Sequence, residues 1–154
     1  KTAMQMTPDQ SFYLTTIWDV LWQLGRHDEA LAALRKGYAG DQGLQGALTR
    51  GFAEDGYQGA FRRLAMYLGA RKPPAWSSSM VAEVYMYAGE KDSALAWLDR
   101  AYRIHEPDVP GNLGLAAFDA VRDDPRFRDL CRRLRLPTCA QDGARTPAAA
   151  PRGS

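Results

Sequence analysis

The sequence predicts an all-α fold: a right-handed stack of about three antiparallel helix pairs, closed by a C-terminal capping helix. A helix–turn–helix pattern occurs twice, and in each copy a glycine, Gly25 or Gly89, ends an apolar stripe. A small residue, Ala30 or Ala94, follows five positions later inside the next stripe. The chain is 45% hydrophobic with a mean hydropathy of −0.42, which is ordinary for a globular domain. These observations favour a packed helical array.

The length of 154 residues favours one domain, which we expect to cover residues 1–136. Residues 137–154 have no apolar period and are expected to form a disordered tail, whose end resembles a cloning or protease-site remnant. No apolar run approaches the roughly 20 residues that span a bilayer. Residues 1–7 have no apolar core of a signal peptide. The chain reads as a piece of a longer protein, whose other parts would decide between a cytoplasmic and a periplasmic location.

The first pair of helices is expected to begin at Thr7, which can cap, with Pro8 in the first turn and Gln10 completing a capping box. This helix should run to Leu24 and stop at Gly25. The second helix has acidic residues at positions 28 and 29 in its first turn and should end between positions 37 and 40.

The second pair is a degenerate repeat. Its first helix spans about residues 44–53, where Gly46 and Gly51 weaken helix propensity but permit the close approach of a neighbouring helix. A break at Gly56 separates it from a helix that ends near Gly69.

The third pair follows a proline-containing connector at residues 71–76. Ser77 or Ser78 is expected to cap a helix that ends at Gly89, and its partner spans about residues 91–104. We then expect an extended stretch after Pro107 and one short turn at residues 118–121. The capping helix follows, with Asp124 as its cap and Pro125 in its first turn. Its inner face carries Phe127, Leu130, Cys131 and Leu134.

The stretch from about residue 56 to residue 136 resembles a bacterial version of the tetratricopeptide repeat (TPR). The resemblance rests on Tyr85-Met86-Tyr87-Ala88-Gly89-Glu90-Lys91-Asp92, Ala94-Leu95-Ala96-Trp97-Leu98, Ala101-Tyr102, Phe118-Asp119 and Arg122-Asp123-Asp124-Pro125-Arg126-Phe127. The 64-residue separation of Gly25 and Gly89 is close to twice the roughly 34-residue period of this repeat. In the family an acidic-proline pair usually precedes the Phe-Asp pair, whereas this chain has Leu115 and Ala116.

This version of the fold often forms the C-terminal region of winged-helix transcription factors, cyclase-like proteins or serine/threonine kinases. The resemblance therefore implies a scaffold or sensor role with a protein or peptide partner. Some members of the superfamily grip a C-terminal carboxylate with Lys, Arg and Asn side chains. The single asparagine here, Asn112, lies outside the paired helices, so that clamp is not expected.

Charge and cysteine content restrict the partners further. A net charge of +2 is too small to indicate nucleic acid. The six arginines between Arg122 and Arg135 form either a solvated helix face or a basic contact patch. Cys131 fits the apolar stripe of the last helix, and a disulfide to Cys139 stays open.

Catalytic chemistry is not indicated. The two histidines, His27 and His105, lie at helix ends without metal-ligand spacing, and the serines at 77–79 have no base placed beside them. Each glycine has a helix-ending or packing interpretation, so no phosphate loop is expected. We expect no cofactor, no metal, no nucleic acid and no membrane insertion by this chain, and an enzyme is the least favoured class.

The candidate partner-binding residues lie on the first helix of each pair, off the packed stripe and on the expected concave face. They are Phe12, Thr15, Asp19, Trp22, Gln23, Gln45, Thr49, Arg50, Glu83, Met86 and Tyr87. Trp22 either anchors a partner or packs on a neighbouring helix. The chain is thus expected to be a non-catalytic protein–protein interaction module of a larger bacterial regulator. The alternative is a homodimerisation module that uses the N-terminal edge or the arginine-rich last helix.

Overall fold

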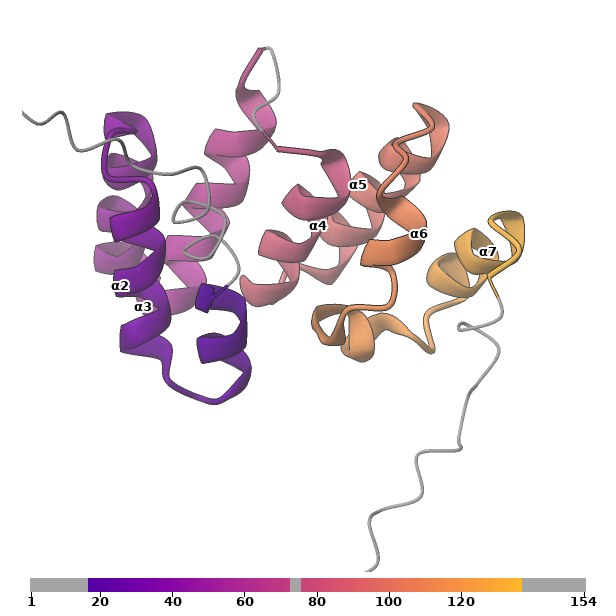
Figure 1. Ribbon diagram of the computed structural model, residues 1–154, viewed down its shortest axis with the longest axis horizontal. Coiled ribbons are helices and arrows are strands. Elements are labelled where there is room, and N and C mark those ends of the chain that lie inside the picture. The colour runs from indigo at the N-terminus through magenta and orange to yellow at the C-terminus, as the bar shows by residue number, and fades with distance from the viewer. Residues whose placement is uncertain (1–16, 73–75, 137–154) are drawn as a thin grey trace, which may run out of the picture. The chain divides into compact units, whose positions relative to one another are not determined.

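The computed structural model describes residues 17–72 and 76–136, and every regular element in those ranges is helical (Figure 1). The predicted all-α class is therefore confirmed. Within the same ranges, no helix combines the length and apolar character needed to cross a membrane. The predicted helix start at Thr7 and the predicted tail at 137–154 lie outside the described residues.

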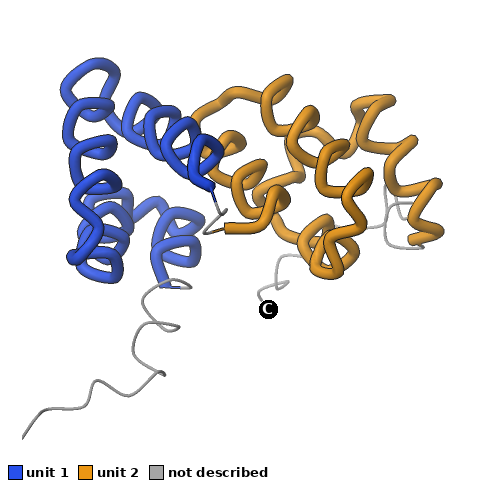
Figure 2. The backbone as a smooth tube through the Cα atoms, turned by 90° about the horizontal axis from the view of Figure 1, so that it is seen from above, with its two compact units in different colours: residues 1–73 blue, residues 74–154 orange. Residues whose placement is uncertain are grey.

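The chain divides into two compact units, residues 1–73 and residues 74–154, within what the sequence predicts as one domain (Figure 2). The boundary falls inside the predicted proline connector. Each unit contains one of the two glycine turns from which the fold class was predicted.

The glycine turns have the same geometry in both units. In unit 1, residues 17–23 are helical, Gly25 has φ of 74°, and α2 (His27–Gly37) follows. The Gly25 N–H donates to the Trp22 carbonyl at 2.9 Å, and the Arg26 N–H donates to the Leu21 carbonyl at 2.9 Å. This pair of bonds is a Schellman motif, which satisfies the last carbonyls of a helix and favours glycine at the left-handed position.

In unit 2 the same motif lies between α4 (Ser78–Tyr87) and α5 (Lys91–Arg103). Gly89 has φ of 75°, its N–H donates to Met86, and the Glu90 N–H donates to Tyr85 at 2.9 Å. Ala30 and Ala94 are completely buried one turn into the following helices. The predicted register of both turns is thus correct.

The segment α3 (Gln42–Ala70) consists of two helices joined at a kink, where Asp55 and Gly56 have non-helical backbone angles. A Cβ added to Gly51 would lie 2.1 Å from the carbonyl oxygen of Gly59, and a Cβ added to Gly43 would lie 2.5 Å from the Tyr67 ring. Both contacts are symmetrical about residue 55. The two halves of α3 therefore fold back on each other as an antiparallel pair, and the predicted break at Gly56 is correct.

The N-terminus of α3 is tied to its C-terminal half through one carboxylate. Asp41 accepts hydrogen bonds from the Leu44 N–H at 3.0 Å and the Tyr67 hydroxyl at 2.7 Å. Its other oxygen lies 2.6 Å from the Arg71 guanidinium. Desolvation opposes ionisation of Asp41, but these three partners together lower its pKa.

Unit 2 has one apolar core, to which all of its helices contribute. Ser77 caps α4, as predicted, by accepting from the Met80 N–H. The core residues lie on α4, α5, α6 (Val109–Asn112), the 3₁₀ helix η1 (Ala116–Val121) and α7 (Pro125–Arg133). Asp124 caps α7 as expected, accepting from the Arg126 N–H at 2.9 Å.

One local prediction for unit 2 is wrong. The stretch after Pro107 was expected to be extended, but it contains the short helix α6. Pro110 is tolerated there because the first turn of a helix does not use its N–H groups. Val109 and Leu113, both 1% exposed, fix this turn to the core.

Cys131 on α7 is buried, as the apolar stripe predicts, and it is disulfide-bonded. Cys139, the other cysteine of the sequence, lies outside the described residues.

Candidate functional site

The candidate residues near the N-terminus form local contacts in unit 1. Trp22 stacks on His27 with ring centroids 4.0 Å apart and meets the edge of Phe61 at 4.8 Å. Trp22 therefore packs on neighbouring helices, which is one of the two roles that the sequence left open for it, the other being a partner anchor. Gln23 donates to Asp19 at 3.0 Å on the same helix. Phe12 and Thr15 lie outside the described residues.

The candidates on α3 connect this helix to α2. The Gln45 amide donates to the carbonyls of Arg35 at 2.9 Å and Tyr38 at 3.0 Å, so it satisfies the C-terminus of α2. The Thr49 hydroxyl accepts from Arg35 at 3.1 Å. Arg50 is exposed. Of these three side chains, two have a clear structural role.

The candidates on α4 are mostly buried. Glu83 and Tyr87 are each 8% exposed, and the Tyr87 hydroxyl donates to Glu83 at 3.2 Å. Met86 packs against the core of unit 2. The structure thus groups the candidate residues within each unit into small local sets, and it gives many of them packing or capping roles.

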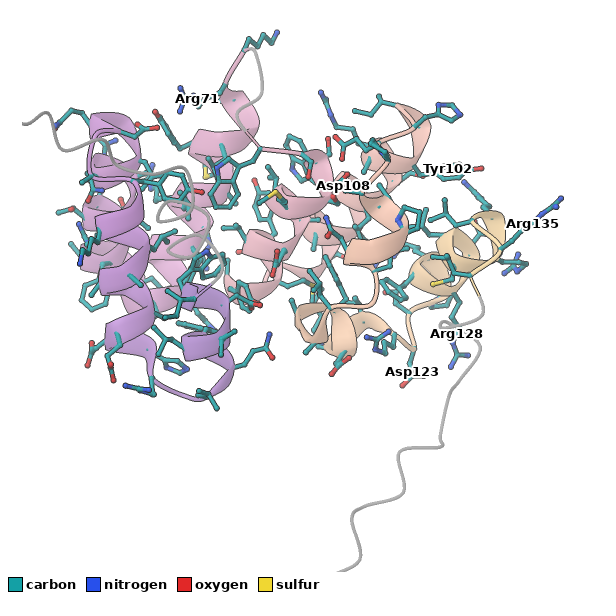
Figure 3. The ribbon with its side chains drawn as sticks, in the orientation of Figure 1. Arg71, Tyr102, Asp108, Asp123, Arg128 and Arg135 are labelled. Atoms are coloured by element: carbon teal, nitrogen blue, oxygen red, sulfur yellow. The ribbon has the colours of Figure 1, made fainter. Side chains whose placement is uncertain are left out.

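A polar cluster at the N-terminus of α4 was not predicted. Glu106 accepts from the backbone N–H groups of Ser78 at 2.8 Å and Ser79 at 3.2 Å. Asp108 accepts from Ser77 at 2.7 Å and from Asn112 at 3.2 Å (Figure 3). Ser79 is completely buried, so its hydroxyl is not presented to a substrate. This cluster caps α4 and joins it to the segment that leads into α6.

Neither histidine belongs to a metal-binding arrangement in the described ranges. His27 stacks on Trp22, and His105 occupies a left-handed position after α5 with φ of 56°. No group of three or more His, Cys, Asp or Glu side chains that could hold a metal ion occurs among residues 17–72 and 76–136.

The arginine-rich segment carries its own counter-ions. Arg122 pairs with Asp119 at 2.6 Å, and Arg128 pairs with Asp123 at 2.7 Å at the start of α7 (Figure 3). Arg132 and Arg133 both pair with Asp129. The positive charges of these four arginines are therefore compensated by carboxylates within the segment.

Unit 2 contains a groove between α5 and α7 with a volume of about 320 Å³. Each helix contributes four residues spaced i, i+3, i+4 and i+7, which is one face over two turns. The α5 wall consists of Asp92, Leu95, Ala96 and Asp99, and the α7 wall consists of Arg126, Asp129, Leu130 and Arg133. We call this feature the α5–α7 groove.

Ion pairs cross the α5–α7 groove at both ends. Arg126 lies 2.8 Å from Asp92, and Arg133 lies 3.9 Å from Asp99. In both pairs the partners are 34 residues apart in the sequence. Because the pairs occur in the same order along both helices, α5 and α7 run parallel.

The electrostatics of the groove follow from these pairs. Hydrogen bonds to Asp124 and Asp92 raise the pKa of Arg126, and the same guanidinium lowers the pKa of Asp124. Between the charged ends lie the apolar side chains of Leu95, Ala96 and Leu130, together with the carboxylate of Asp129. The volume is at the lower end of the roughly 300–1,000 Å³ typical of binding sites. The arrangement can accept an apolar side chain and hold charges of both signs beside it.

Sequence reasoning missed the α5–α7 groove because the arginines of the last helix were interpreted as a solvated face or a basic contact patch, and no partner helix was assigned to them. A signal was present: the two i, i+3, i+4, i+7 faces are separated by 34 residues. That separation equals the repeat period expected for stacked helix pairs, roughly 34 residues.

Comparison with known proteins does not extend this description. The all-α class rests on the helices of the structure, and the tetratricopeptide resemblance rests on the sequence motifs. No protein-family model, curated protein or solved structure matches the chain.

Proposed function

We propose that this chain is a non-catalytic interaction module of a larger bacterial regulatory protein, and that it binds a protein or peptide partner. The observation that carries the proposal is the α5–α7 groove, which combines an apolar centre with exposed charges of both signs. Such a combination is typical of surfaces that recognise another chain.

The groove is a better candidate than the predicted concave face. Glu83 and Tyr87 are buried, and Gln45 and Thr49 are hydrogen-bonded to α2. The charges of the groove are accessible, since the Asp92 side chain is 88% exposed and that of Arg126 is 56% exposed. We therefore assign partner binding to the α5–α7 groove.

We also propose that the helix pairs form a tetratricopeptide-like stack. Two observations support this arrangement. The turns at Gly25 and Gly89 share one backbone geometry, and the parallel helices α5 and α7 are offset by one repeat period.

The binding proposal can be tested by selecting peptides from a random display library on the intact chain. Ala96→Trp fills the centre of the groove, and Ala32→Trp makes the same change at an exposed position of α2. Selected peptides should lose about tenfold or more in affinity, or roughly 1.4 kcal/mol, for Ala96→Trp. They should keep their affinity for Ala32→Trp. Peptides that bind both variants equally well would contradict the proposal.

Self-association is a second candidate function, favoured by an exposed apolar stripe in unit 1. Ile17, Val20 and Leu24 are 46%, 50% and 65% exposed; the first two lie on the helix that precedes Gly25, and Leu24 follows directly after that helix. If this stripe joins two copies, light scattering should show a mass that rises with concentration. Val20→Glu should abolish the rise, whereas Met66→Glu, at an exposed apolar position of α3, should not.

A further inference from the structure

We infer that the partner is an amphipathic helix that lies along the α5–α7 groove, with a basic flank over α5 and an acidic flank over α7. This inference rests on the proposed function and adds the conformation and charge pattern of the ligand. It is carried by the spacing and the signs of the charges on the two walls.

The spacing of the walls matches a helix. On each wall the outer charged residues are seven positions apart, which corresponds to about 10.5 Å along a helix axis. Because α5 and α7 are parallel, these charges form two rows of equal length. A third helix aligned with them would present its own residues seven positions apart to both rows. An extended peptide would cover the same length in about three residues.

The signs of the charges determine which flank of the ligand faces α5 and which faces α7. The α5 wall has an aspartate at each end, Asp92 and Asp99. The α7 wall has an arginine at each end, Arg126 and Arg133, with Asp129 between them paired to Arg133. Lys or Arg side chains of the ligand would therefore lie over α5, and Glu or Asp side chains beside Arg126 and Arg133 at the two ends of the α7 wall. Opposite placement would bring like charges together, which disfavours binding.

The centre of the groove specifies the apolar face of the ligand. Leu95 and Leu130 are each 5% exposed, so they form a shallow floor. Ala96 beside them is exposed and small, which lets a neighbouring backbone come close. One or two Leu, Ile or Met side chains at the middle of the ligand face fit this floor.

The existing ion pairs do not block such a ligand. The two pairs that cross the groove join partly exposed side chains, and exposed ion pairs contribute little to stability. A ligand can exchange them for its own charges at little net free energy. The charges therefore determine the orientation of the ligand more than its affinity, and their contribution weakens as salt rises.

The inference is tested with two peptide libraries displayed on the same scaffold and selected on the intact chain. One library is built on a helix-forming backbone, and the other contains prolines that prevent a helix. The helical library should yield peptides that compete for the groove, with basic residues seven positions apart on one flank and acidic residues on the other.

A matched pair of variants then tests the basic flank. Asp99→Lys reverses a charge of the α5 wall. Asp123→Lys makes the same change at a side chain that is 92% exposed and outside the groove. The affinity of helical peptides should fall about tenfold or more for Asp99→Lys, the scale expected for a like-charge contact. It should change less than about twofold for Asp123→Lys, a rim charge outside the contact. Asp92→Lys serves the same purpose if Asp99→Lys unfolds.

Each other outcome overturns the inference in a recognisable way. If only proline-containing peptides are selected, and they lose affinity for Ala96→Trp, the groove binds an extended partner and the proposed function stands. If the groove variants impair self-association of the chain instead, its occupant is a second copy. If no selected peptide responds to Ala96→Trp, both the inference and the proposed function fail.

Discussion

The two helix pairs that the structure describes most fully reach close packing in different ways. In the two halves of α3, the contact is made by backbone, since Gly51 and Gly59 leave no room for a side chain. Between α4 and α5, the contact is made by side chains, with Ala94 and Leu98 completely buried. The comparison shows that one helix-pair architecture can be specified by glycine or by alanine and leucine. The two solutions should respond differently to substitution.

The largest effect is expected at the glycine contact. Gly51→Ala should destabilise the chain by about 3 kcal/mol, because its Cβ would lie 2.1 Å from a backbone oxygen that cannot move independently. Gly46→Ala is the control, since the nearest atom to its Cβ is the side chain of Arg50 at 3.8 Å. There, higher helix propensity should give a gain of up to about 1 kcal/mol. Urea denaturation of both variants measures the difference, and equal destabilisation would refute a specific contact at Gly51.

The alanine contact should be more tolerant. Ala94→Leu adds methylene groups inside a packed core and should destabilise by roughly 1–3 kcal/mol. Ala96→Leu, two positions along α5, adds the same groups at an exposed position and should leave stability within about 0.5 kcal/mol. Wild-type denaturation midpoints for Ala94→Leu would show that the register of α5 is misassigned.

Substitutions at two helix ends should change stability by smaller amounts and in opposite directions. Gly89 and His105 both occupy the left-handed region, with φ of 75° and 56°. Gly89→Ala should destabilise by about 1 kcal/mol, because side chains disfavour this backbone conformation. His105→Gly should stabilise by up to about 1 kcal/mol for the same reason. If thermal unfolding shows the same sign of change for both, the Schellman geometry at one of the two ends is wrong.

The smallest expected effect is a pH-dependent change in stability caused by Asp41 in unit 1. The pKa of Asp41 is lower in the folded state, so its stabilising contribution is present above the unfolded pKa and is lost as the pH falls through the folded pKa. Asp41→Asn keeps an acceptor for the Leu44 N–H but removes the charge that faces Arg71, so it should lower stability by less than about 1 kcal/mol at neutral pH. The deficit should shrink below pH about 4, near the unfolded pKa of an aspartate. A deficit that persists unchanged at low pH would exclude this carboxylate as the source.

The sequence predicted the local elements well where a backbone rule applies. The glycine turns, the break at Gly56 and the Asp124-Pro125 start of α7 each follow from conformational preference or capping. The helix α6 could not be predicted, because four residues with Pro110 and Gly111 have no helical preference, and tertiary burial of Val109 fixes them.

The α5–α7 groove could not be predicted for a different reason. Its walls consist largely of charged residues, and on one helix a face such as that of Asp92 and Asp99 is indistinguishable from a solvated surface. Only the parallel placement of a second helix, offset by 34 residues, turns these faces into a groove. Trp22, by contrast, stood out in the sequence but packs on His27 and Phe61.

The central claim is that partners bind in the α5–α7 groove, and amide chemical shifts during a titration test it most directly. The intact chain, labelled with ¹⁵N, is titrated with the tightest peptide selected from the helical library. We predict that the largest shift changes fall on α5 and α7, around Ala96 and Leu130, and that they are absent from Ala96→Trp. Shifts centred on Asp19, Gln23 and Arg50 instead would contradict the claim and return the binding site to the face that the sequence predicted.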